Sequence, residues 1–363
     1  MRIAQVVPLH VAVPPLGYGG TERVVYELIE ALVQMGHEVT LFASGDSRTS
    51  ARLIPMVDCA INFAPDIDPA GYHAAMLDEV YDRAGQFDII HSHLDYLTLP
   101  FARRTSTPTV LTLHDQLARP EARRLYERYR TANYVSISDS QRKDFPSLNY
   151  IATVHNAVDV DRFPYVAEPG TYLAFVGRMS PQKRPDVAIE IAKRTGIPLK
   201  IAAKVDHREE SYFKETIEPL LDHPLIEWLG QVGEQEKRQL MANALALVLP
   251  IEWPEPFGMV FIEALACGTP VLTCPRGAAP ELLTDDVTGY CCMDIDELVA
   301  ATRKIHRISR RGCRTYARQH FDTQLMAVKY ERVYAQCMGR DYLPTPEIEL
   351  FETGSTTMSQ TVS

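Results

Sequence analysis

The stretch that decides the fold runs from residue 253 to residue 265 and reads WPEPFGMVFIEAL. Pro254 and Pro256 bias the residues before them toward extended backbone, so Glu255 is expected on a loop. Pro256 also suits the first turn of a helix, because its missing N–H has no intrahelical acceptor there. The pattern therefore predicts a loop that leads directly into an apolar helix over 257–267.

One carboxylate stands inside this apolar helix. Between residues 258 and 267, Glu263 is the only charged residue. A buried, ionised Glu is costly unless a partner satisfies it. The hydroxyls of a ribose would do so. The alternative is that Glu263 pairs with an arginine of the core and that Glu255 is a surface loop residue.

The start of the predicted helix adds a candidate anion site. Unpaired backbone N–H groups of Gly258, Met259 and Val260 would point outward from its first turn, where phosphate binds readily. A carboxylate for a sugar (Glu255), amides for a phosphate and a carboxylate for a ribose (Glu263) follow one another along the chain. That order matches the parts of a nucleotide sugar.

Composition places the chain among ordinary globular proteins of two domains. Its 363 residues are 46% hydrophobic and 23% charged. The 37 basic and 47 acidic side chains give a net charge of −10, which argues against a general nucleic-acid binder. No run approaches the roughly 20 apolar residues of a membrane span. A strand-like start at residue 2 without a signal peptide, and seven cysteines without paired metal spacing, predict a cytoplasmic protein.

Short apolar runs alternate with amphipathic stretches, as in parallel sheets covered by helices. Strands are predicted over 2–7, 38–43, 87–91, 108–113, 133–138 and 151–155, and then over 172–177, 198–203, 225–229, 245–250, 270–274 and 289–292. Helices are predicted over 20–35, 181–195, 234–243, 257–267, 279–283, 296–308 and 323–338. Residues 156–170 interrupt the alternation and are interpreted as a linker, and 344–363 as a disordered tail. Two similar α/β domains with a cleft between them are expected.

Glycines and cations occupy corresponding turns of the two halves. Gly19 and Gly20 follow the first strand and open the first helix, where backbone can approach an anion closely; a turn without a ligand is the alternative. Arg178 and Lys183 flank the turn after the first strand of the second half, where open α/β sheets bind ligands. They would suit a leaving pyrophosphate, or else are solvated surface charges.

Three histidines, His91, His93 and His114, are predicted at strand ends in the first half. No carboxylate or further histidine completes a zinc spacing, so no metal site is predicted, and structural histidines are the alternative reading. The three D-x-D triplets, at 66/68, 159/161 and 294/296, suit caps and turns better than a metal.

Arginines cluster twice along the sequence. They stand at 119, 123, 124, 128 and 130, and at 303, 307, 310, 311, 314 and 318. Solvated helix faces are the expected explanation, and contact with a phosphorylated acceptor or an anionic membrane surface is the alternative.

Taken together, residues 1–340 resemble the retaining nucleotide-sugar glycosyltransferases of family 4, which have the α/β GT-B fold of two Rossmann-like domains facing each other across a deep cleft. The most specific element is the E-x7-E run from Glu255 to Glu263 with the ALACGTPV that follows it. Further support comes from GGTE at 19–22, GHEV at 36–39, NAVD at 156–159, Gly177-Arg178 with Lys183, Gly277 through Glu281, and Thr288-Gly289.

The resemblance implies an acceptor-side domain over 1–165, a donor-binding domain over 166–322 and a helix over 323–340 that crosses back to the first domain. Arg178 and Lys183 would hold the donor diphosphate, and Glu263 the ribose hydroxyls. The remaining implied contacts to the donor sugar and phosphates come from Glu255, the backbone of Phe257, Gly258, Met259 and Val260, the first-domain Gly19 and Gly20, and His114.

The implied reaction is transfer of a glycosyl group from a nucleoside diphosphate to a carbohydrate, lipid or small-molecule hydroxyl, with retention and without a metal or other cofactor. The leaving phosphate would take the acceptor proton, so no glycosidase-like pair of acid and base carboxylates is needed. Two departures stand out: Arg184-Pro185 follows Lys183 where glycine is frequent, and Ala202-Ala203-Lys204 replaces glycines, which makes Lys204 a further candidate contact. A sugar-nucleotide epimerase of this architecture and a catalytically silent binding protein are the alternatives.

Overall fold

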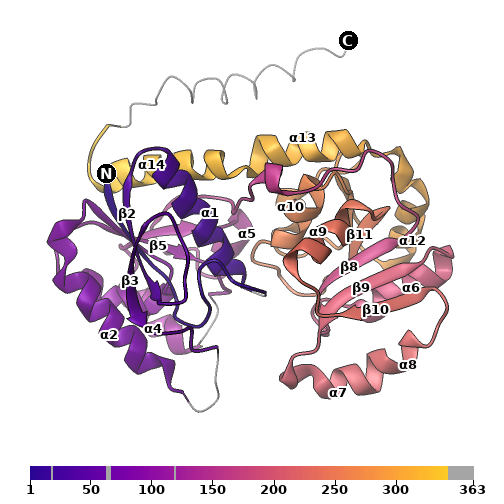
Figure 1. Cartoon of the computed structure of the whole chain (residues 1–363), viewed down its shortest axis with the longest axis horizontal. Coiled ribbons are helices and arrows are strands. Elements are labelled where there is room, and N and C mark those ends of the chain that lie inside the picture. The colour runs from indigo at the N-terminus through magenta and orange to yellow at the C-terminus, as the bar shows by residue number, and fades with distance from the viewer. Residues whose placement is uncertain (18, 63–66, 118–119, 342–363) are drawn as a thin grey trace, which may run out of the picture. The chain divides into compact units, whose positions relative to one another are not determined.

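The computed structural model describes residues 1–17, 19–62, 67–117 and 120–341. The chain forms two compact units, one of the described residues within 1–157 together with 323–341, and one of Val158–Asp322 (Figure 1). The boundary follows Ala157, earlier than the expected residue 165, and the terminal helix α14 (Thr323–Cys337) belongs with the first unit. The predicted tail, 344–363, lies outside the described residues.

The first unit is built on a parallel sheet. Its strands are ordered β3 (Arg52–Val57), β2 (Glu38–Ser44), β1 (Arg2–Val6), β4 (Ile89–Ser92), β5 (Thr109–Leu113), β6 (Asn133–Ser136) and β7 (Tyr150–Thr153). Its helices are α1 (Gly20–Gln34), α2 (Pro69–Asp82), α3 (Leu99–Ala102), α4 (Pro120–Arg128), α5 (Asp139–Arg142) and α14. Helices α1 and α14 pack together on one face, and α2 closes an apolar core with alternate residues of β1 such as Ala4 and Val6 on the other.

The second unit repeats this design. Its parallel sheet is ordered β10 (Ile226–Gly230), β9 (Leu199–Lys204), β8 (Leu173–Arg178), β11 (Ala246–Leu249), β12 (Val271–Thr273) and β13 (Gly289–Cys291). Its longer helices are α6 (Pro185–Thr195), α9 (Glu234–Ala242), α10 (Met259–Ala266), α12 (Ile295–Lys304) and α13 (Arg310–Phe321), with short helices α7 (Glu210–Tyr212), α8 (Glu218–Leu221) and α11 (Ala279–Leu282). Helices α6 and α12 pack against each other, and α10 packs with α9 and α13. The two Rossmann-like α/β units that the sequence predicts are confirmed.

The structure corrects several element predictions. Strand β3 was not predicted; it is a partly exposed edge strand containing Pro55, whose missing N–H is tolerated only at such a position. The sequence does not predict helices α2, α4 and α13; α4 and α13 are mostly polar and charged, so few apolar residues mark their helical period. Helix α6 begins at Pro185 rather than residue 181, and α10 begins at Met259 rather than 257, because Gly258 turns the chain in a left-handed conformation.

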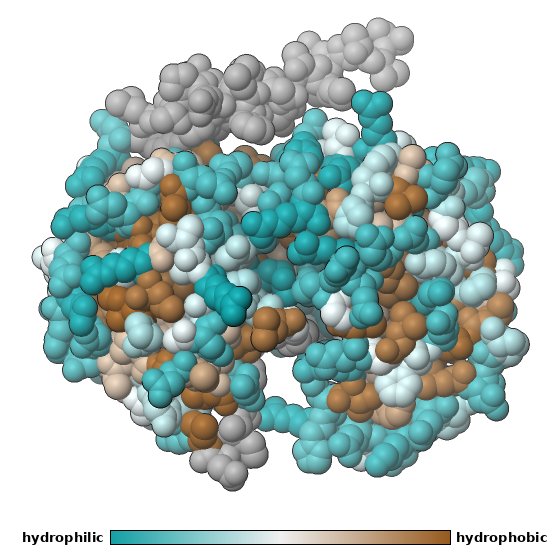
Figure 2. Space-filling view, viewed as in Figure 1, coloured by the Kyte–Doolittle hydropathy of each residue, from teal (hydrophilic) through white to brown (hydrophobic). Residues whose placement is uncertain are grey.

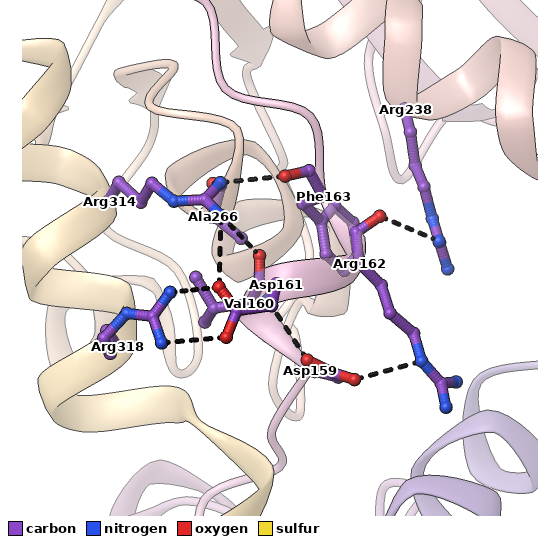
Figure 3. A network of polar contacts seen from close by, with 9 residues as sticks. All are labelled: Asp159, Val160, Asp161, Arg162, Phe163, Arg238, Ala266, Arg314 and Arg318. Atoms are coloured by element: carbon purple, nitrogen blue, oxygen red, sulfur yellow. Dashed lines mark hydrogen bonds and ion pairs between the residues drawn. The ribbon is translucent and has the colours of Figure 1, made fainter.

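The segment interpreted as a linker is fixed within the second unit (Figure 3). Asp159 caps a short turn by accepting a hydrogen bond from the Asp161 N–H at 3.1 Å. Arg314 donates to the carbonyls of Val160 and Phe163 at 3.0 and 2.8 Å. The start of the predicted linker is therefore packed structure.

Two arginines of the second cluster are not solvated, contrary to the prediction. Arg310 is buried and donates to the carbonyl oxygens of Val166, Ala244 and Ala242 at 2.7, 2.8 and 2.6 Å. Arg314 is engaged with the packed segment described above. Such charge-assisted bonds to backbone are among the stronger hydrogen bonds in proteins. These arginines are occupied in holding the second unit together; Arg119 of the first cluster lies outside the described residues.

The visible surface is mostly hydrophilic, with apolar residues in separate groups (Figure 2). Within the described ranges, no helix combines the length and the apolar character that crossing a membrane would require.

Candidate active site

The strand order of each sheet creates one place where loops diverge. In the second unit the order is that of the Rossmann fold: the first strand, β8, lies between β9 and β11, and the connections that follow β8 and β11 leave in opposite directions. Ligands of open α/β sheets bind at the carboxyl ends of such a strand pair. The predicted residue Arg178 ends β8, Lys183 follows β8, and Glu255 follows β11.

Lys183 and Glu255 meet at this point. The Lys183 ammonium forms an ion pair with Glu255 Oε2, and both side chains are largely buried. The Trp253 indole N–H donates to the same carboxylate oxygen at 2.9 Å, and its ring lies 5.3 Å from Lys183 Nζ, within range of a cation–π contact. Two loops far apart in sequence therefore join in one charged cluster.

Arg178 stands at the end of β8 beside a second cation. Its Nη1 lies 3.8 Å from Asp206 Oδ2, and Lys204, its neighbour in register on β9, places Nζ 2.6 Å from Asp206 Oδ1. Arg178 Nε is buried without a hydrogen-bond partner among the described residues. Lys204 thus lies next to Arg178, in the position that makes it a candidate for ligand contact.

The turn between β8 and α6 keeps a glycine-like conformation without a glycine. Arg184 has a φ of +53°, in the left-handed region, immediately before Pro185 opens α6. Its guanidinium bonds Asp186 at 2.9 Å and pairs with Glu252 of the β11 loop. This anchoring offsets the strain, so the departure at Arg184 preserves the turn that presents Lys183.

Helix α10 begins two residues later than predicted and keeps two of the expected amides in its first turn. Gly258 caps it with a φ of +100°, and a Cβ there would lie 2.6 Å from the Phe261 ring. The N–H groups of Met259 and Val260 occupy the first turn, which has no intrahelical acceptors. Phe257 is buried, so only its backbone is a candidate for ligand contact.

Glu263 is buried on α10 with 3% of its surface exposed. Its two carboxylate oxygens each lie 3.0 Å from the ammonium of Lys237 on α9, which also pairs with Glu234 at 3.0 Å. The Glu263 carboxylate therefore has a partner within the unit, as expected if it pairs in the core rather than with a ligand. That partner is a lysine rather than the expected arginine.

The corresponding turn of the first unit follows β1, at the switch between β1 and β4. Gly19 caps α1, and a Cβ there would lie 2.8 Å from Pro15 Cβ and 3.1 Å from Glu22 Oε2. A Cβ at Gly20 would meet no atom within 4 Å. Close packing explains the glycine at position 19, whereas nothing in the described fold requires one at position 20.

Glu22 lies beneath this turn with 6% of its surface exposed. Burial raises its pKa from 4.5 to about 7, a bond to its own backbone opposes the rise, and nearby Asp115 adds to it. Because the folded-state pKa exceeds the unfolded one, this group favours the folded state below pH 4.5, and its contribution is lost as the pH rises through 7.

Replacing Glu22 by glutamine is expected to raise stability by less than about 1 kcal/mol at pH 5 and by more at pH 8. The gain at pH 8 should be at most about 3.5 kcal/mol, since one unit of pKa shift corresponds to roughly 1.4 kcal/mol. Thermal unfolding of variant and wild type at the two pH values measures their difference in stability at each pH. Titration of the other groups affects both proteins alike and cancels in this difference. An equal difference at both pH values would contradict the pKa assigned to Glu22.

The three predicted histidines come together at the carboxyl ends of β4 and β5. His93 Nδ1 lies 2.8 Å from His114 Nε2, and the rings of His91 and His93 are 4.2 Å apart. Burial lowers the pKa of His114 to about 4 and those of His91 and His93 well below the usual value. All three are therefore neutral at pH 7. Among the described residues no group of three or more His, Cys, Asp or Glu side chains is arranged to hold a metal ion.

Sequence reasoning missed several neighbours of these residues. Trp253 and Lys237 complete the Glu255 and Glu263 clusters, and Asp206 joins Arg178 to Lys204. Gln5, fully buried, contacts His93. Only Gln5 had a signal in the sequence, because it is the single polar residue inside the apolar run of the first strand.

The two Rossmann-like units match the fold of GT-B proteins. Residues 159–320 match the family described as Glycosyl transferases group 1, and residues 18–162 match Glycosyltransferase Family 4. The chain is therefore a glycosyltransferase of the family-4 type, built on the Rossmann-like units of GT-B proteins.

Similar proteins include a glycogen synthase of Mycobacterium tuberculosis, 25% identical over 93% of this chain and 96% of its own length. A phosphatidyl-myo-inositol mannosyltransferase of Mycolicibacterium smegmatis is 27% identical over 93% of this chain and 95% of its own length. The structure of Anabaena Alr3699/HepE in complex with UDP matches with a TM-score of 0.73 and 18% identity, covering 93% of this chain and all of that one.

Proposed function

We propose that this protein transfers a sugar from a nucleoside diphosphate to an acceptor hydroxyl, with retention of anomeric configuration and without a metal ion. The observation that carries the proposal is the Lys183–Glu255 cluster at the switch point of the second sheet, with Arg178 on the same strand end. A similar fold in Alr3699/HepE holds UDP, which supports a nucleotide as ligand.

On this proposal the second unit binds the donor. Arg178 and Lys183 take the diphosphate, together with the first-turn amides of Met259 and Val260. Glu263 accepts hydrogen bonds from the ribose while its ion pair with Lys237 orients the carboxylate. The first unit contributes acceptor binding, the Gly19–Gly20 turn and His114.

The Lys183–Glu255 ion pair is then the resting state of the site. A diphosphate carries more negative charge than one carboxylate, so it competes for Lys183. Glu255 is thereby released toward sugar hydroxyls, still held by the Trp253 N–H. Without donor, the pair keeps two buried charges satisfied, which avoids the cost of an unpaired buried ion.

The chemistry follows from where charge develops. As the glycosidic bond breaks, negative charge grows on the leaving phosphate, and fixed cations and amides stabilise it. The phosphate oxygen accepts the proton of the attacking hydroxyl on the same face, which retains configuration. Cations supplied by the protein make a divalent ion unnecessary, so we expect full activity in the presence of a chelator.

The proposal places the protein in the cytoplasm, where its seven cysteines, all unpaired, remain reduced. It includes no nucleic-acid partner, and it uses a carbohydrate, lipid or small-molecule acceptor. Weak contact with an anionic membrane surface would rest on the exposed arginines near Arg123 and Arg124, since Arg310 and Arg314 bind backbone carbonyls.

Arg178→Ala and Glu263→Ala are each expected to weaken binding of nucleoside diphosphates about 10- to 100-fold, as for loss of hydrogen bonds to charged groups. Calorimetric titration of UDP, GDP and ADP measures the effect. Arg194→Ala removes a cation of similar exposure that pairs with Asp296 at 2.6 Å, and it should bind like wild type. Unchanged affinity in the first two variants would remove the assignment.

The rival functions give different results in a screen of nucleotide sugars. A transferase releases nucleoside diphosphate, faster with an acceptor. A sugar-nucleotide epimerase isomerises the donor without an acceptor, and a silent binding protein shows affinity without turnover. Glycosyl transfer with an inverted product, detected by proton NMR of the anomeric centre, would overturn the retaining mechanism alone.

A further inference from the structure

A chain of hydrogen bonds runs through the first unit from helix α14 to His114. The Tyr334 hydroxyl lies 2.8 Å from His91 Nδ1, and the Gln5 side chain lies next to both of these residues. His93 then connects Gln5 to His114. Every member except His114 is fully buried or nearly so. Buried polar side chains in a sheet are costly, so a connected network of this kind is a specific feature of the fold.

The side-chain amide of Gln5 gives the network a direction. Its carbonyl oxygen can only accept, so the bond of 2.9 Å to His93 Nε2 requires a proton on that nitrogen. Its NH2 group can only donate, and it lies 3.1 Å from the Tyr334 hydroxyl and 3.3 Å from His91 Nδ1. The neutral His93 therefore has an unprotonated Nδ1.

The direction continues to His114. Because His93 Nδ1 is an acceptor, the contact of 2.8 Å requires His114 Nε2 to donate. A neutral imidazole carries a single proton, so Nδ1 of His114 is unprotonated. This nitrogen can accept a hydrogen bond from a hydroxyl and cannot donate one.

Tyr334 and His91 keep the Gln5 amide in this orientation. The Tyr334 hydroxyl donates its proton to His91 Nδ1 and accepts from Gln5. His91 Nε2 then donates to the Thr112 hydroxyl at 2.7 Å, which is bonded to Tyr330 at 2.8 Å. Reversing the amide would require the Tyr334 proton to turn from His91 to Gln5, and the His91 proton to move from Nε2, where it faces Thr112, to Nδ1. Without the Tyr334 hydroxyl, the His91 proton can move from Nε2, which faces Thr112, to Nδ1. The Gln5 amide can then reverse.

We propose that Gln5, His91 and Tyr334 are positioning residues that fix the Nε2–H tautomer of His114, so that its Nδ1 presents a hydrogen-bond acceptor to a substrate hydroxyl. With the Gln5 amide in this orientation the tautomer follows from the hydrogen bonds, whereas its use on a sugar rests on the proposed function. The terminal helix α14 thereby contributes to the active site without touching the substrate.

Nitrogen-15 NMR of the full chain labelled at histidine tests the proposal, with His114→Gln identifying the resonances. In the wild type, His91, His93 and His114 should each show a protonated Nε2 and an unprotonated Nδ1. Gln5→Met and Tyr334→Phe should give His114 a mixed or Nδ1–H tautomer. Tyr81→Phe removes a comparable buried hydroxyl, bonded to Thr109 at 3.1 Å, and should leave the spectrum of His114 unchanged.

Activity gives a second readout. Tyr334→Phe should lower kcat about tenfold, a loss typical of one hydrogen bond, while the Kd for nucleoside diphosphate, which is assigned to the second unit, stays as in wild type. A wild-type His114 protonated on Nδ1, or an unchanged His114 spectrum in the Gln5→Met and Tyr334→Phe variants, would overturn the inference. Failure of the proposed function would instead appear as wild-type protein without turnover, and the tautomers would still decide the inference.

Discussion

Replacement of Lys183 by methionine is expected to lower kcat by about 10²–10³-fold, the loss typical of removing one group that stabilises developing negative charge. Lys183 is the cation that the ion pair with Glu255 brings to the switch point of the second sheet. Methionine has a similar length and packs against Trp253, so the change removes charge with little change in shape. Steady-state kinetics with the best donor of a nucleotide-sugar panel measures the effect.

Two further variants separate loss of function from loss of structure. Lys200 is the matched control, because like Lys183 it has a carboxylate and an aromatic ring as neighbours: it pairs with Glu227 at 3.0 Å and lies 5.0 Å from the ring of Tyr172. It lies near the amino end of β9, away from the carboxyl ends of the strands. Lys200→Met should keep wild-type turnover. The double change Lys183→Met with Glu255→Gln removes the unpaired buried charge, so stability should recover without activity. Equal losses at Lys183 and Lys200 would show that Lys183 has no special role.

Gly277→Ala should reduce the free energy of unfolding by about 3–5 kcal/mol and abolish most donor binding, because overpacking and left-handed strain act together. Gly277 has a φ of +59°, and a Cβ there would lie 2.2 Å from both the N and the O atoms of Glu255. The Ala278 N–H also donates to the Glu255 carbonyl at 2.9 Å. An added methyl group must therefore displace the loop that carries the catalytic candidate.

Gly196→Ala is the matched control for this prediction. Gly196 has a φ of +71° at the end of α6, and a Cβ there would meet no atom within 4 Å. The Gly196→Ala substitution should lower the free energy of unfolding by about 1 kcal/mol, from backbone strain alone. Chemical denaturation gives both stabilities, and titration with nucleoside diphosphate gives both affinities. Similar behaviour of the two alanine variants would mean that the close approach at Glu255 is not what places the loop.

Much of the fold is predictable from local pattern. The predicted strands of the second half all exist, because buried parallel strands are short apolar runs with clear limits. Helix α14 was predictable from its apolar periodicity over residues 323–338. Strand β3 was not, because Pro55 interrupts its apolar run, and a proline inside such a run argues against a strand unless the strand lies at an edge.

The candidate site, like the fold, is only partly predictable from local sequence. Arg178, Lys183, Glu255 and Glu263 were identifiable because each stands beside a proline, a glycine or an apolar run that makes a charge unexpected. Their partners were not identifiable. Lys237 and Asp206 come from other elements, and nothing in their local sequence distinguishes them from solvated surface charges.

The sequence by itself determined two parallel α/β units, the loops that carry the charged residues and the resemblance to a family of sugar transferases, since these depend on periodicity and short motifs. Only the tertiary structure decided which charges pair, that Arg310 and Arg314 face inward to backbone carbonyls, and that Tyr334 lies within reach of Gln5 and His91. Such contacts join residues as many as 329 positions apart. They follow from how strands order and helices pack, which no local pattern contains.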